Sequence, residues 1–156
     1  MMKGNFDAAF SHVVDLEGGY SNDPHDPGGE TKYGVSKRAY PGEDIANLTI
    51  QRAKEIYLSD YWNKCRCDEL PYPLDYYVLD AAVNQGVSKA IKMLQEVVGV
   101  KQDGIIGPVT IKAAHTRHDT AHLYMAERAV RYFATENFYR FGKGWLKRIF
   151  KLAREA

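Results

Sequence analysis

Apolar residues recur at the spacing of an α-helix along most of the chain. Near the N-terminus, Phe6, Phe10 and Val13 lie at i, i+4 and i+7, which is the pattern of a single helix face. Glu17 lies four residues beyond Val13 and continues this row, so the helix would carry its last carboxylate on the apolar side. A Gly-Gly pair follows at once and predicts the helix end, because glycine tolerates the left-handed cap conformation.

The same spacing predicts helices over the rest of the sequence. Ser36 is expected to cap a short helix that ends before Pro41. The longer helices are expected from Thr49 to about Trp62, from Pro73 or Leu74 to Gly86, from Ser88 to Val98, from Pro108 onward, from Asp119 or Thr120 past Phe138 to a break at Gly142, and from Gly144 onward.

One stretch departs from the helical pattern. Residues 21–31 hold two Asp-Pro pairs and a Gly-Gly pair, and this density of turn residues predicts a polar hairpin. The sequence therefore predicts a mainly α fold with a small β-hairpin wing. No linker, repeat or low-complexity segment interrupts it, so we expect one domain spanning residues 1–156.

The helix that begins at Pro73 or Leu74 is apolar nearly all round, which predicts the central buried helix of the fold. Asp80, Asn84 and Gln85 are its polar exceptions, and a buried polar group needs a partner. Two interpretations remain open for these three residues. They form either the floor of a cleft that hydrogen-bonds a sugar, or a network satisfied within the core.

Carboxylate side chains are the strongest candidates for catalytic groups. A carboxylate at the end of a buried stripe is desolvated, so Glu17 would have its pKa raised toward the range of a general acid. The hairpin would bring Asp23, Asp26 or Glu30 opposite it. One carboxylate in an apolar setting and one in a polar setting are the working parts of glycosidic bond cleavage. A glutamate at a helix end beside an ordinary turn is the competing interpretation.

The run EGGYSNDPHDPGGETKYGVSKR resembles the signature of family 108 of the glycoside hydrolases, which are lysozyme-like N-acetylmuramidases of phages and bacteria. The resemblance implies a lysozyme-like helical domain that hydrolyses peptidoglycan, with Glu17 as the catalytic acid. Its interval to Asp26 is similar to the acid-to-aspartate interval of phage-type lysozymes, so Asp26 is the expected second carboxylate and Thr31 the expected holder of a water. Asp23 and Glu30 remain alternatives for Asp26.

The expected substrate-binding residues are Tyr20, Tyr33, Asn84 and Gln85. Aromatic faces stack on sugar rings, although a place in the core or at its rim is the more frequent fate of a tyrosine. For the two amides, the resemblance favours the cleft, since similar enzymes carry the N-Q-G segment.

The second half of the chain also resembles the family. Residues 87–156, with their G-W-x-x-R element, are similar to its C-terminal, peptidoglycan-associated helical part. The run LQEVVGVKQDGIIGPVT looks like a segment of peptidoglycan-binding modules, and here we expect it to have a structural role within the single domain. A lytic transglycosylase and a non-catalytic peptidoglycan-binding protein are the alternative functions.

Composition and charge narrow the classes of molecule that the protein is expected to bind. Of 156 residues, 26% are charged and the formal net charge is only +1, which gives no field that would favour nucleic acid. Cations nevertheless concentrate between Arg128 and Arg154, either as a solvated helix face or as a surface for an anionic wall or membrane. We expect neither metal nor cofactor. The H-E-x-x-H motif of metal sites is absent around His115, His118 and His122. The loop from Asp23 to Glu30 does not have the residue order of a calcium-binding loop. Cys65 and Cys67 are expected to be reduced thiols.

The sequence contains no long apolar run, and its first residues lack the apolar core of a secretory signal. We therefore expect synthesis in the bacterial cytoplasm and action on the cell wall in the periplasm. The resemblance adds a phage or prophage endolysin that lyses its host after holin-dependent release. We expect it to act as a monomer.

Overall fold

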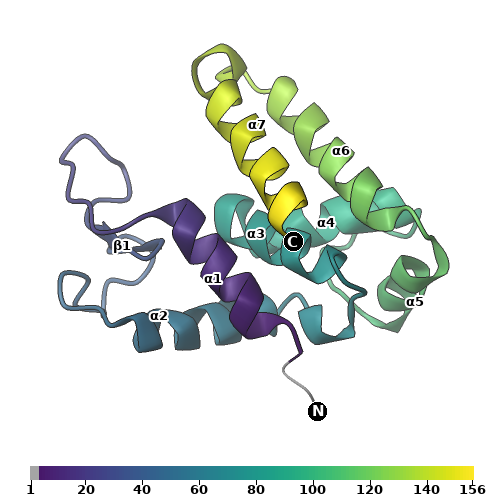
Figure 1. The fold of residues 1–156 in the computed structure, drawn as a ribbon, viewed down its shortest axis with the longest axis horizontal. Coiled ribbons are helices and arrows are strands. Elements are labelled where there is room, and N and C mark those ends of the chain that lie inside the picture. The colour runs from purple at the N-terminus through teal and green to yellow at the C-terminus, as the bar shows by residue number, and fades with distance from the viewer. Residues whose placement is uncertain (1–3) are drawn as a thin grey trace.

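Helices account for most of the computed structural model, which describes residues 4–156 (Figure 1). The predicted mainly α fold with a small hairpin is confirmed. The helices are α1 (Phe6–Glu17), α2 (Ile50–Tyr57), α3 (Leu74–Gln85), α4 (Val87–Val98), α5 (Pro108–Thr116), α6 (Thr120–Phe133) and α7 (Phe138–Glu155). A π-helical turn (Leu58–Trp62) extends α2, a 3₁₀ turn (Cys67–Glu69) precedes α3, and the strands are β1 (Thr31–Lys32) and β2 (Val35–Ser36).

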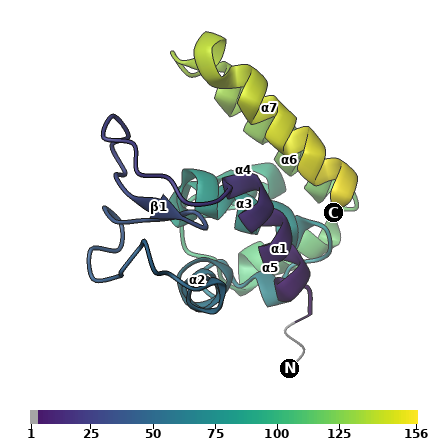
Figure 2. The same ribbon diagram turned by 60° about the vertical axis from the view of Figure 1, so that its left-hand side comes forward.

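The central element is α3. Every residue from Leu74 to Ala82 is buried, and α3 packs against α1, α4 and α6. A helix that is apolar on all sides must be covered on all sides, so the predicted central position of α3 is confirmed. Figures 1 and 2 show α6 and α7 lying side by side and extending away from this centre. Cys65 and Cys67 are buried in the same core as free thiols.

The hairpin lies beyond the C-terminal end of α1 (Figure 2). Its two strands are antiparallel, with Thr31 opposite Ser36 and Lys32 opposite Val35, and an isolated bridge joins Ser21 to Thr31. A small hairpin is thus confirmed, but its strands lie over residues 31–36, and the predicted stretch of residues 21–31 forms the polar loop that the Ser21 bridge closes. The short helix expected after Ser36 is wrong, because the chain makes only one turn there. In that turn, the N–H of Ala39 donates to Oγ of Ser36 at 3.2 Å.

The expected break at Gly142 is also wrong. Gly142 and Gly144 both lie inside α7, and the chain instead turns over residues 134–137. Gly142 is buried against a ring of its own helix, since a Cβ atom added there would lie 2.5 Å from Cε2 of Phe138. This glycine therefore permits close packing and does not end the helix.

The DGIIGPVT run is tied to the core by a single side chain. Gln95 of α4 is buried, and its Nε2 donates to Oδ1 of Asp103 at 2.8 Å and to the carbonyl oxygen of Ile105 at 3.0 Å. Its Oε1 accepts from the N–H of Gly104 at 3.0 Å. One buried amide thus fixes the loop between α4 and α5. Within residues 4–156, no helix is both long enough and apolar enough to cross a membrane.

The two glycines of α7 predict opposite stability changes. Gly142→Ala should lower the free energy of unfolding by about 1–3 kcal/mol, because the new methyl group overlaps the Phe138 ring. Gly144→Ala meets no atom within 4 Å and should raise it by up to about 1 kcal/mol, since alanine restricts the unfolded chain. Urea denaturation measures both. Equal effects of the two substitutions would contradict the close-packing role of Gly142.

Candidate active site

Glu17 is the last residue of α1 and lies beneath the turn of the hairpin. A Cβ atom added to Gly34, at the tip of that turn, would lie 2.9 Å from Cγ of Glu17 and would overlap the hydroxyl oxygen of Tyr57. That hydroxyl donates to the carbonyl oxygen of Tyr33 at 2.7 Å. Helix, hairpin and Tyr57 thus enclose the stem of the glutamate, and its Oε1 is buried although the side chain is 22% exposed.

A cation also faces this carboxylate. Nη2 of Arg148, from α7, lies 2.7 Å from Oε1 of Glu17, as an ion pair whose angle falls outside hydrogen-bond geometry. The apolar setting expected from the sequence is therefore only part of the environment. The carboxylate lies between a packed apolar stem and an arginine.

Arg148 in turn belongs to a chain of charges that reaches the centre of the fold. Its Nη2 donates to Oδ1 of Asp80 at 2.8 Å, and Asp80 also accepts from Nη1 of Arg128 at 2.8 Å. Arg128 donates to the hydroxyl of Tyr132 at 2.9 Å, and that hydroxyl donates to Oδ1 of Asn84 at 2.6 Å. The side chains of Asp80 and Arg128 are fully buried. Of the two interpretations open for Asp80, the core network is the one observed: both oxygens of Asp80 accept hydrogen bonds, while Nε of Arg128 has no partner among the described residues.

The burial of these groups and their charges act in opposite directions on their pKa values. Burial alone would raise the pKa of Asp80, but Arg128 and Arg148 together lower it below its usual range. Burial alone would lower the pKa of Arg148, but Asp80 and then Glu17 raise it. Both groups are therefore charged near neutrality. Burial, and next the charge of Glu17, raises the pKa of Tyr57 above its usual range, so its hydroxyl keeps its proton.

Asp26 and Thr31 lie near each other at the far end of the short strand ladder. Oδ1 of Asp26 accepts from the N–H of Gly28 at 2.8 Å. A Cβ atom added to Gly28 would lie 3.3 Å from that oxygen, 3.9 Å from Oγ1 of Thr31 and 3.5 Å from Cβ of Ser36. Ser36 pairs with Thr31 at this end of the ladder, whereas Gly34, two residues earlier in the chain, is the residue that contacts Glu17.

The two alternative carboxylates have partners of their own in the same loop. Oδ1 of Asp23 accepts from the N–H of His25 at 2.8 Å, and Oε2 of Glu30 accepts from the hydroxyl of Tyr20 at 2.7 Å. Both are local contacts that shape the loop. Neither is recorded beside Glu17.

The four expected substrate-binding residues occupy different places. Tyr20 is half exposed and bonded to Glu30, and Tyr33 forms the hairpin turn with a positive φ of 52°. Asn84 is exposed at the end of α3 and bonded to Tyr132, and Gln85 beside it is half-buried. All four lie at surfaces around the ends of α1 and α3.

Sequence reasoning missed the arginines that hold this site. The sequence gives Arg128 only a place in a basic stretch and Arg148 only a place in that stretch and in the G-W-x-x-R element. A signal for both existed, because an aspartate in the middle of a buried helix must find cations somewhere in the chain. The G-W-x-x-R element ends on one of them, Arg148.

Comparisons with known proteins agree with this geometry. The family model described as glycosyl hydrolase 108 matches residues 10–86, and one described as a predicted peptidoglycan domain matches residues 89–150. Among solved structures, that of Brucella abortus SagA is 38% identical, with a TM-score of 0.88, and the match covers 98% of this chain and 94% of that one. No curated protein matches the sequence.

The fold and the matched regions define a glycoside hydrolase of lysozyme-like fold. The chain belongs to the glycosyl hydrolase 108 family, as the resemblance of its first third implied. It is a peptidoglycan hydrolase, and the second matched region supports peptidoglycan as its substrate.

The contact between the hairpin turn and Glu17 can be tested with two glycines of similar backbone conformation. Gly34 and Gly29 have φ values of 77° and 68°, but only Gly34 has neighbours within 4 Å. Gly34→Ala should therefore cost about 1–3 kcal/mol more stability than Gly29→Ala. It should also lower wall-degrading activity about 100-fold by displacing Glu17. Thermal unfolding and a turbidity assay measure the two effects, and equal activity of the two variants would contradict the contact.

Proposed function

We propose that the protein is an N-acetylmuramidase, a lysozyme that hydrolyses the β-1,4 bond between N-acetylmuramic acid and N-acetylglucosamine. The observation that carries the proposal is the position of Glu17. It lies at the end of a buried helix, under the hairpin turn, with one oxygen held by Arg148. In this proposal Glu17 is the general acid that protonates the leaving oxygen.

Arg148 is the positioning residue of this proposal. It is held to Asp80 by three contacts of 2.8–3.2 Å, so it stays in place whichever protonation state Glu17 adopts. A general acid must be supplied with a proton and must keep its orientation through the reaction. The packed stem of Glu17 and the fixed guanidinium of Arg148 supply that orientation.

Asp26 is the proposed second carboxylate, and Thr31 its partner in holding water. Asp26 would either activate a water molecule or stabilise positive charge on the sugar. Its Oδ1 and Oγ1 of Thr31 both lie close to Gly28, which supports a joint role. Tyr20, Tyr33, Asn84 and Gln85 are proposed to bind the sugar rings on either side of the cleaved bond.

We further propose that residues 1–156 work as one unit, since the ion pairs of Arg148 cross from one matched region to the other. The proposed biological role is that of a monomeric endolysin. It would be made in the host cytoplasm and reach the periplasmic wall through holin-dependent release. If so, cells that express it lyse only after chloroform or a holin opens the inner membrane.

Glu17→Gln should lower the lysis of chloroform-treated Gram-negative cells by about 100-fold or more, because the amide cannot donate the catalytic proton. Its melting temperature should stay near that of the wild type. The matched control is Asp15→Asn, an exposed carboxylate on the same helix, which should lyse normally. Wild-type lysis by Glu17→Gln would refute the assignment. In mass spectra of digested wall, reducing ends support hydrolysis, and anhydro-muramic ends would identify a lytic transglycosylase instead.

Asp26→Asn should also lower activity by about 100-fold, while wall binding is retained. Asparagine keeps an oxygen for the N–H of Gly28, so the loop turn survives and only the charge is lost. Asp23→Asn and Glu30→Gln remove charges from the same loop and should have effects below about threefold. If either of these is the damaging change, the second carboxylate is that residue and not Asp26.

A further inference from the structure

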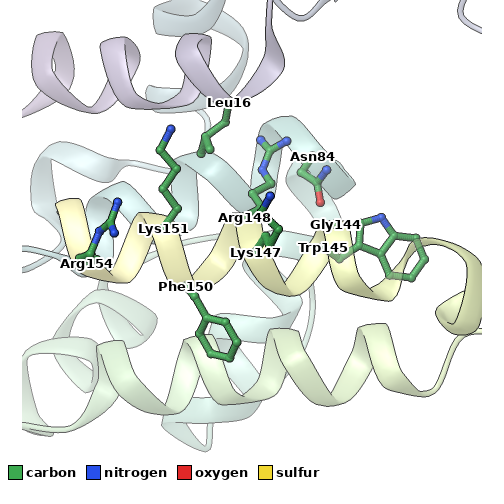
Figure 3. A pocket seen from close by; sticks show the side chains of 9 residues that line it. All are labelled: Leu16, Asn84, Gly144, Trp145, Lys147, Arg148, Phe150, Lys151 and Arg154. Atoms are coloured by element: carbon green, nitrogen blue, oxygen red, sulfur yellow. The ribbon is translucent and has the colours of Figure 1, made fainter.

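A groove lies between α1 and α7, next to the ion pair of Glu17 (Figure 3). Its volume is about 680 Å³. Leu16 of α1 points toward α7, while Arg148 and Lys151 point from α7 toward α1. Asn84 of α3 lies at one end of the groove, beside Trp145. The remaining lining residues all come from α7: Gly144, Lys147, Phe150 and Arg154.

The groove is strongly cationic. Four of its nine lining residues are basic and none is acidic. Arg148 and Arg154 already contact carboxylates, Arg154 through its neighbour Glu155. Lys147 and Lys151 are exposed, and no ion pair of either is recorded among the described residues. Two ammonium groups therefore line this space with no counterion from residues 4–156.

Apolar walls accompany these charges. Trp145 stacks on Tyr132, with ring centroids 5.0 Å apart and planes 24° from parallel. Tyr132 is itself fixed by hydrogen bonds to Arg128 and Asn84, so the indole is held on a rigid support. With Leu16 opposite, the groove presents apolar surface between cationic groups. Uncharged sugar rings cannot form ion pairs with these cations, whereas a short peptide with carboxylates and methyl groups matches both the charged and the apolar surface.

We propose that this groove binds the peptide stem of peptidoglycan through the stem's carboxylates. The proposal rests on the proposed function, because it concerns the same substrate at the same site. In peptidoglycan the stem is attached to N-acetylmuramic acid, whose glycosidic bond is the proposed point of cleavage. Arg148 joins the two places, since it lines the groove and lies 2.7 Å from Glu17. Cleavage at Glu17 thus brings the stem of the bound sugar to the groove.

Anion binding here also has a consequence for the charges around Glu17. Glu17 and Asp80 balance Arg128 and Arg148, so protonation of Glu17 leaves one positive charge uncompensated. A stem carboxylate beside Arg148 supplies the missing counterion. The substrate itself then completes the charge balance around Glu17, and a strand whose stem carboxylates have been converted to amides does not.

The test compares two substrates: glycan strands that carry peptide stems with free carboxylates, and the same strands after those carboxylates have been converted to amides. The wild type should have the higher kcat/KM on the strands with free carboxylates. Lys147→Gln/Lys151→Gln should reduce this preference about fivefold or more, since two ionic contacts are lost. The matched control is Arg140→Gln/Lys143→Gln, which removes two charges from the same helix outside the groove and should keep the preference.

A second measurement separates this proposal from the proposed function. In a sedimentation assay, Glu17→Gln should bind strands with free stem carboxylates more strongly than the amidated strands, and adding the Lys147 and Lys151 substitutions should abolish the difference. If the wild type cleaves neither substrate, the proposed function fails, while this binding assay still decides the groove. Equal use of both substrates by the wild type overturns the groove. An equal loss in the control variant also overturns it and indicates general attraction to an anionic surface, such as vesicles of phosphatidylglycerol.

Discussion

Asp80 imposes the constraint on which the rest of the molecule depends. It is a fully buried carboxylate in the middle of α3, and an unpaired charge in such a place would cost several kcal/mol. The chain meets this requirement with Arg128 from α6 and Arg148 from α7. Both helices of the extended pair are thereby tied to the central helix at one point. The tie is directional, because guanidinium and carboxylate groups must align to satisfy each other's hydrogen bonds.

The same tie organises the catalytic end of the fold. Arg148 has one face on Asp80 and one on Glu17, so the position of α7 and the orientation of the proposed acid are set together. On the other side, Gly34 and Tyr57 close around the stem of Glu17. The glutamate is thus held by a strong polar contact at its head and by packing along its carbons. Each of these restraints comes from a different part of the chain, which is the arrangement that fixes a reactive group most firmly.

Much of this was readable in the sequence, where the cause was local. The row from Phe6 to Glu17 followed by two glycines fixed the end of α1 correctly, because helix periodicity and capping are properties of neighbouring residues. Gly142 misled because the same residue type ends helices and permits close packing, and only the Phe138 ring distinguishes the two. The break between α6 and α7 has no glycine or proline to mark it. The partners of Asp80 lie 48 and 68 residues away, beyond the reach of any local pattern.

The charge chain has a consequence for anyone who recombines such enzymes. Its members alternate between the two regions that family models recognise, with Glu17 and Asp80 in the first and Arg128 and Arg148 in the second. A chimaera made by joining these regions from different relatives at residues 87–88 would divide every one of these ion pairs between two parents. Such a chimaera would keep these ion pairs only if the parent of the second region carries arginines at the positions of Arg128 and Arg148. The boundary between the two matched regions is therefore one that cuts through a connected set of buried charges.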